Sequence, residues 1–210
     1  AAKPLSSSPK RWSPASRPSE FHVKQRVLTL PGWQGSGPEH WQSRWESLYG
    51  YERVEQNDWQ RPLRGEWSVR LDEVMADASD PVVLVAHSLG CQLVAWWAAH
   101  SRHVKRVSAA VLVAPPDVEQ QHELLQRLHS WTPIARQALP FKTLVLASSD
   151  DPYCSLERAQ AMVADWGAEF VDLGALGHIT AESGLGDWPE GHAQLQGLLA
   201  GRRDSSRSPA

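Results

Sequence analysis

The most constraining feature of this sequence is an apolar run that leads directly into a short turn and a helical stretch. Pro81 precedes Val-Val-Leu-Val-Ala at 82–86, His-Ser-Leu-Gly follows at 87–90, and residues 91–100 have a helical pattern. A continuous run of apolar, mostly β-branched residues is typical of a strand buried on both faces of a parallel sheet. The run therefore predicts a central strand, followed by a tight turn and a covering helix.

The same alternation of strand and helix continues along the chain. Apolar runs predict strands at 27–30, 107–114, 143–147 and 169–173, and helical spacing predicts helices at 38–49, 66–78, 118–130, 155–166 and 188–200. Alternating strands and helices with apolar strands imply a mostly parallel sheet that has helices on both faces. We therefore expect an α/β protein built on such a sheet.

The two ends of the chain set the limits of the expected domain. Residues 1–20 are rich in Pro, Ser and basic residues, and residues 201–210 have a similar composition, so both predict disordered tails. The 210 residues correspond to one domain at about 100–200 residues per domain. We expect one α/β domain at 21–200, which leaves no room for a large cap domain.

The charge distribution argues against a nucleic-acid-binding core. The chain has a net charge of −3, but residues 1–20 carry +3 and residues 201–210 carry +2, which leaves −8 on residues 21–200. An acidic body lacks the positive field that binding to phosphate backbones requires. No apolar run approaches the roughly 18 residues that indicate a membrane span. We expect neither nucleic-acid binding nor a membrane span.

The cysteines and histidines give no sign of a disulfide framework or a metal site. Cys91 and Cys154 are far apart and outside any Cys-x-x-Cys pair, so two buried free thiols in a reducing compartment are expected. His40, His122 and His129 lack the spacing of metal ligands. We expect a cytoplasmic monomer without metal or cofactor.

The turn at Ser88 has the strand–turn–helix context of a nucleophile elbow, and we therefore expect the domain at 21–200 to have the α/β-hydrolase fold. Such a turn lifts the serine hydroxyl above the strand ends and places the backbone N–H of Leu89 at a helix N-terminus, where an oxyanion can be bound. Ala86 stands where the motif has glycine, and its small side chain still permits close packing of helix and strand. The alternative is that Ser88 is only a helix-capping serine.

A nucleophilic serine needs a base, because its free hydroxyl is hardly ionised at neutral pH. In this fold the order along the chain is Ser, then Asp or Glu, then His, which leaves His178 and His192 as candidates. His178 lies in a glycine-flanked loop directly after the last predicted strand, where this type of sheet binds its ligands. We therefore assign His178 as the base and place His192 on the surface of the closing helix. His87, next to Ser88, is expected to point away from it.

The third member of the triad is expected after the strand at 143–147, where both Asp150 and Asp151 are available. We favour Asp151, because the ring of Pro152 makes the turn after it rigid. Its carboxylate would accept the Nδ1–H of His178 and fix the tautomer of the imidazole. Asp150 would then cap the following helix, although Asp-Pro after a strand is also a common turn.

The glycine-rich loop at 31–37 is expected to supply the second oxyanion donor. The N–H of Trp33 is the favoured donor and that of Gln34 the alternative, unless the loop is a flexible connector. We place Gly32, Gln34 and Trp41 in the substrate pocket, with Trp33 and Trp41 as its walls. Trp59 and Trp67 could close over the pocket, although core packing is the more frequent role of buried tryptophan.

Four ordered segments resemble one family of small serine hydrolases, that of retinoblastoma-binding protein nine and the bacterial YdeN proteins. They are L-P-G-W-Q-G-S-G-P-E-H-W-Q-S-R-W-E, A-H-S-L-G-C, S-S-D-D-P-Y-C and G-H-I-T-A-E-S-G-L-G-D-W-P-E-G, and the resemblance covers residues 27–200. It implies a compact fold without a large lid, and the triad order Ser88, Asp151, His178. It also implies hydrolysis of short acyl carboxylic esters.

These inferences predict a serine hydrolase that cleaves small or short-acyl carboxylic esters through an acyl-enzyme. The expected partner is a small-molecule ester. Two other functions stay open: a protein-interaction module on a hydrolase fold with little activity, and an acyltransferase or amidase that uses the same residues.

Overall fold

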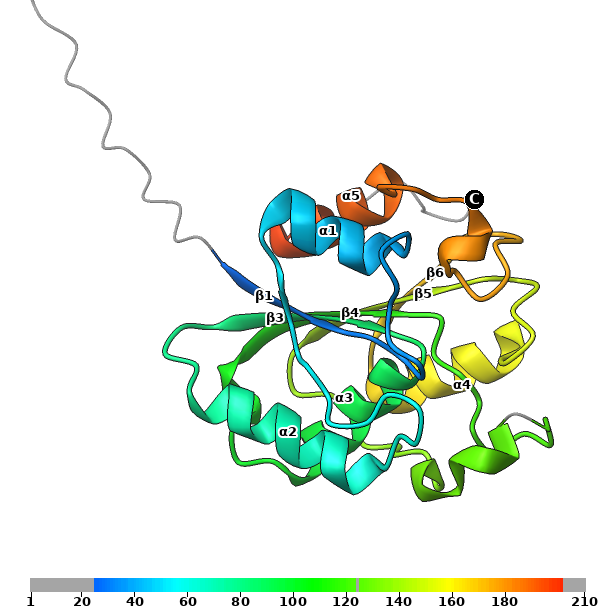
Figure 1. Cartoon of the computed structure of the whole chain (residues 1–210), viewed down its shortest axis with the longest axis horizontal. Coiled ribbons are helices and arrows are strands. Elements are labelled where there is room, and N and C mark those ends of the chain that lie inside the picture. Colours follow the sequence, from blue (N-terminus) through cyan, green and yellow to red (C-terminus); the bar gives the residue numbers. More distant parts are fainter. Residues whose placement is uncertain (1–24, 124, 202–210) are drawn as a thin grey trace, which may run out of the picture.

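The computed structural model describes residues 25–123 and 125–201, which form a sheet covered by helices on both faces (Figure 1). All paired strands are parallel, in the order β2-β1-β3-β4-β5-β6. The strands are β1 (Arg26–Leu30), β2 (Glu52–Arg53), β3 (Val82–His87), β4 (Val107–Val113), β5 (Lys142–Ala147) and β6 (Glu169–Asp172). The predicted tails at 1–20 and 201–210 lie outside the described residues, apart from Gly201.

Two helices cover one face of the sheet and three cover the other (Figure 1). On the first face lie α1 (Trp41–Tyr49) and α5 (Pro189–Leu199), and on the second lie α2 (Arg64–Ala76), α3 (Leu89–His100) and α4 (Leu156–Trp166). Val83 and Val85 pack toward α1 and α5, whereas Val82, Leu84 and Ala86 pack toward the opposite layer. Both faces of β3 are therefore buried, which explains its uninterrupted apolar run. The α/β class predicted from the sequence is confirmed.

One predicted helix is wrong. Residues 118–130 were expected to form a polar, exposed helix, but the chain turns after Val118 and forms the short 3₁₀ segment η2 (Leu125–Trp131) instead. Leu128 and Trp131 are buried, and the Trp131 indole N–H donates to the carbonyl of Pro62 at 2.9 Å. These tertiary contacts anchor the segment in a kinked path that a regular helix would not follow.

Nothing in the sequence predicted the strand β2, because its two residues, Glu52 and Arg53, are both charged. It pairs with Leu28 and Thr29 of β1 at the edge of the sheet. The remaining short segments are two 3₁₀ turns, η1 (Val104–Arg106) and η3 (Ala181–Ser183).

The carboxyl ends of the parallel strands lie along one edge of the sheet, the edge at which sheets of this type bind ligands. The loops that follow β1, β3, β5 and β6 start there, and no large cap domain is inserted among the described residues. Within residues 25–123 and 125–201, no helix has the length and apolar character needed to cross a membrane.

Candidate active site

The backbone makes a sharp turn at Ser88, between β3 and α3. Ser88 has φ 53° and ψ −124°, a positive-φ conformation that non-glycine residues rarely adopt. Its N–H donates to the carbonyl of Val113 at 2.9 Å, and its own carbonyl accepts from Cys91 at 2.8 Å. Its side chain makes no capping hydrogen bond to α3. The turn therefore points the hydroxyl away from the helix, which does not fit a capping role.

Two glycines permit the close packing that this turn requires. A Cβ on Gly90 would lie 2.2 Å from the carbonyl oxygen of Leu30, and one on Gly32 would lie 2.7 Å from the Cβ of Ser88. The first contact is with backbone, which cannot move aside as a flexible side chain could. Glycine at position 90 is thus required for α3 to pack against β1.

We expect Gly90→Ala to lower the free energy of unfolding by about 3 kcal/mol or more, as other overpacking substitutions do. Gly197 in α5 is the matched control, because a Cβ there would meet no atom within 4 Å. Gly197→Ala should stabilise the protein by about 0.5–1 kcal/mol through helix propensity. Urea unfolding of both variants tests this, and equal effects at the two positions would contradict the packing argument.

The structure brings Ser88, His178 and Asp151 together, although they are far apart in the chain. The Nε2 of His178 lies 2.7 Å from the Ser88 Oγ, and its Nδ1 lies 2.8 Å from the Asp151 Oδ2 and 3.0 Å from the Oδ1. A carboxylate can only accept, so Nδ1 carries the proton and Nε2 is free to accept from the hydroxyl. The side chain of Asp151 is 3% exposed and that of His178 12%, so water hardly weakens this pair.

Asp150 has a different role from the one that the sequence suggested. It does not cap α4, whose N-cap is Ser155. Instead its Oδ1 accepts from the Ser148 hydroxyl at 2.8 Å and from the N–H of Gly177 at 2.7 Å. These two bonds lower the pKa of Asp150 below its ordinary value. Asp150 therefore holds the loop that carries His178.

Leu89 and Trp33, whose backbone N–H groups were expected to bind the oxyanion, both line the same cleft. Leu89 is the first residue of α3, where an N–H has no acceptor within its own helix. The N–H of Gln34 donates to the carbonyl of Trp59 at 2.9 Å and is thereby committed to the loop. Of the two N–H groups considered in the loop after β1, that of Gln34 is therefore already used, and Trp33 stays the favoured donor.

The cleft at the carboxyl edge of the sheet has a volume of about 1000 Å³. Ser88, His178, Gly32 and Gln34 all line it. Trp41 does not: it is 1% exposed and packs in the layer between α1 and the sheet. The pocket assignment of Trp41 is therefore wrong, because the first residue of α1 faces the sheet rather than the cleft.

Trp59 and Trp67 do not close over the cleft either. Trp67 is 1% exposed, and Trp59 packs edge-on against it. The Trp59 ring would also lie 3.4 Å from a Cβ on Gly35. Core packing, the more frequent role of tryptophan, applies to both.

Two side chains hold the backbone at His178 in place. The His87 ring nitrogen Nε2 donates to the carbonyl of His178 at 2.9 Å, and the Trp41 indole N–H donates to the carbonyl of Ile179 at 2.9 Å. Both donors are buried. The His87 ring lies 5.1 Å from that of His178, and His87 lines the cleft. No local pattern could have signalled this contact, because it joins the last residue of β3 to the loop after β6.

A second buried histidine, His40, lies beside His87. It is the N-cap of α1, its Nδ1 accepts from the N–H of Gln42, and its ring centroid is 4.7 Å from that of His87. Its Nε2 is buried and has no hydrogen-bond partner among the described residues. Burial lowers the pKa of His40 from 6.5 to about 4 and that of His87 well below its ordinary value. Both imidazoles are therefore neutral near pH 7.

This predicts a loss of stability in mild acid. Well above pH 6.5, His40 is neutral in both the folded and the unfolded state. As the pH falls toward 4, His40 becomes protonated in the unfolded chain but stays mostly neutral in the folded protein. The free energy of unfolding should therefore fall by roughly 3 kcal/mol over that range from His40 alone. His40→Asn, which keeps a capping acceptor, should flatten the decline, whereas His129→Asn at an exposed position should not. An unchanged pH profile in His40→Asn would contradict the prediction.

No cluster of three or more His, Cys, Asp or Glu side chains within the described ranges is placed to hold a metal ion. Cys91 and Cys154 are free and buried, and burial raises the pKa of the Cys154 thiol to about 12. These thiols are thus poor nucleophiles at neutral pH.

Comparison with known proteins agrees with this geometry. Residues 27–197 match the family model described as serine hydrolase. A YdeN-like hydrolase of Pectobacterium atrosepticum is 29% identical, with 84% of this chain and 91% of that chain covered and a TM-score of 0.73. The ydeN gene product of Bacillus subtilis is 18% identical, with 84% and 99% covered and a TM-score of 0.69. None of the curated proteins matches the sequence.

Proposed function

The chain belongs to the serine hydrolase family, and on that premise we propose that it cleaves small or short-acyl carboxylic esters through an acyl-enzyme on Ser88. The observation that carries the proposal is the 2.7 Å approach of the His178 Nε2 to the Ser88 Oγ, with Asp151 bound to the other ring nitrogen. A serine becomes nucleophilic when a positioned base takes its proton as it attacks.

In the first proposed step His178 takes the hydroxyl proton while Ser88 attacks the ester carbonyl. The negative charge that develops on the carbonyl oxygen is stabilised by the N–H groups of Leu89 and Trp33. Asp151 stabilises the imidazolium that forms. His178 then returns the proton to the departing alcohol, which leaves the acyl group on Ser88. In the second step His178 activates water, which releases the acid and restores the serine.

The size of the substrate is inferred from the surroundings of Ser88. The cleft of about 1000 Å³ is lined by loops at the sheet edge, and no inserted cap domain among the described residues extends it into a tunnel. Long acyl chains would lack an apolar channel in which to be buried. Small esters and short acyl groups fit this cleft better than long lipids.

The test is labelling of the purified protein with a fluorophosphonate, followed by mass spectrometry and a substrate panel. The label is expected on Ser88, and hydrolysis should be fastest for short esters in a series from acetate to laurate. No labelling at Ser88 would favour the interaction module instead. Faster turnover of laurate would contradict the size argument, and faster turnover of matched amides, or transfer to added alcohols, would contradict the assignment as an ester hydrolase.

A further inference from the structure

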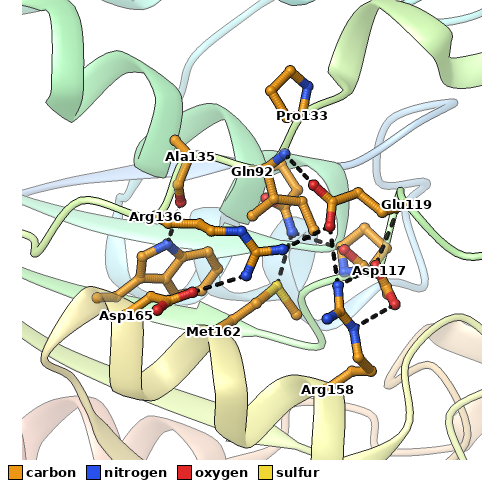
Figure 2. Close-up of polar contacts among 12 residues, drawn as sticks. Gln92, Asp117, Glu119, Pro133, Ala135, Arg136, Arg158, Met162 and Asp165 are labelled. Atoms are coloured by element: carbon orange, nitrogen blue, oxygen red, sulfur yellow. Dashed lines mark hydrogen bonds and ion pairs between the residues drawn. The ribbon is translucent and has the colours of Figure 1, made fainter.

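The segment between β4 and β5 forms one side of the cleft and is tied to α4 by ion pairs (Figure 2). Arg158 of α4 binds Asp117 at 2.7 Å and Glu119 at 3.1 Å. Arg136 binds the same Glu119 at 2.7 Å and Asp165 of α4 at 2.9 Å. Each of these carboxylates thus has an arginine partner, and the network fixes the path of the segment on both sides of η2.

Arg127, in the middle of this segment, has no such partner. Its guanidinium carbon lies 5.8 Å from the centroid of the Trp33 ring, and its side chain is exposed and lines the cleft. Among the described residues, no carboxylate lies within ion-pair distance of it. An arginine held beside the proposed oxyanion loop therefore presents an uncompensated positive charge to any molecule in the cleft.

Glu182 of η3 also lines the cleft, and no ion pair joins it to Arg127 among the described residues. His40 and His87 line the cleft too, and burial keeps both neutral. An anion in the cleft would consequently be attracted toward Arg127 beside Trp33. Planar guanidinium groups suit carboxylate and phosphate oxygens, which they can bind with two parallel N–H donors.

We infer that the cleft selects esters that carry a second, anionic group, a carboxylate or a phosphate, which Arg127 binds beside Trp33. Arg127 is thus a residue that determines specificity, acting on the substrate's charged end rather than on the reacting carbonyl. The inference rests on the proposed ester hydrolysis at Ser88. Because Arg127 is exposed, its effect should be moderate and should weaken as salt is added.

The experiment compares two 4-nitrophenyl esters of adipate that differ by one charge. In the anionic ester the second carboxyl is free, and in the neutral ester it is methylated. The wild-type kcat/KM is expected to be about five- to tenfold higher for the anionic ester, mainly through KM. The ratio should shrink when the ionic strength is raised from low values to about 0.15 M. An equal or lower kcat/KM for the anionic ester would overturn the inference.

Arg127→Gln should bring the ratio of the two kcat/KM values close to one, and Arg127→Lys should retain part of the preference. Arg102→Gln is the matched control, because it removes the same charge from an exposed residue at the opposite edge of the sheet, before β4. An equal loss in Arg102→Gln would overturn the inference in favour of a general charge effect. If neither ester is hydrolysed, the proposed function fails; if both are hydrolysed without discrimination, only the role of Arg127 fails.

Discussion

Replacing Ser88 with alanine is expected to lower kcat/KM for short esters by about 10⁴- to 10⁶-fold and to abolish fluorophosphonate labelling. The reason is that the hydroxyl is the only part of the proposed machinery that forms the covalent bond. Residual turnover above the uncatalysed rate would come from the backbone donors at Leu89 and Trp33, which the substitution leaves intact. Steady-state kinetics with a chromogenic ester measures the loss.

The structure also predicts that this variant folds normally. The Ser88 side chain makes no capping bond to α3, and within residues 25–123 and 125–201 its hydroxyl is hydrogen-bonded to His178 alone. Its removal should therefore change the free energy of unfolding by no more than about 1 kcal/mol. A stable Ser88→Ala protein that keeps more than a tenth of the activity would contradict the nucleophile assignment, whereas a large loss of stability would point to a structural role instead.

The second large effect is expected for Asp151→Asn, which should lower kcat/KM by about 10³- to 10⁴-fold with little change in fold. An amide in this place can donate to the Nδ1 of His178, which shifts the ring proton to Nε2. The nitrogen that lies 2.7 Å from the Ser88 hydroxyl would then carry a proton and could no longer accept one. The pH dependence of kcat/KM, measured alongside, would show whether the loss persists when more alkaline conditions are used.

Asp150→Asn is the matched control for this substitution, because it makes the same chemical change in the adjacent residue. Asp150 binds Ser148 and Gly177 and does not contact the His178 ring. We expect a loss of about tenfold or less in kcat/KM, because the two hydrogen bonds that hold the His178 loop become weaker when their acceptor loses its charge. A larger loss of activity in Asp150→Asn than in Asp151→Asn would reverse the assignment of the two carboxylates.

The local pattern of the sequence was enough to predict the fold and the order of the three site residues. An uninterrupted apolar strand requires burial on both faces, and in a parallel sheet this places the next turn at the ligand-binding edge. Ser88, Asp151 and His178 lie in the turns or loops that follow β3, β5 and β6, so their convergence follows from the topology. This reasoning needs no knowledge of side-chain packing, which is why a single sequence supports it.

The tertiary structure alone decided how the residues around these three are used. Trp41 was expected in the pocket, yet its indole supports the backbone at Ile179 from inside the core. His87 binds the carbonyl of His178, and the predicted helix around Leu128 is a kinked 3₁₀ segment. Each of these outcomes depends on a partner many residues away, and sequence periodicity reports only which face of an element is apolar.

The sequence by itself thus determined the α/β fold, the sharp turn at Ser88 and the chain order of the site, because these depend on local patterns and on the geometry of parallel strands. Only the tertiary structure decided that His87 and Trp41 hold the His178 loop and that Arg127 stands unpaired in the cleft. Those features depend on which side chains meet across separate elements, and the meeting is set by the packing of the whole domain.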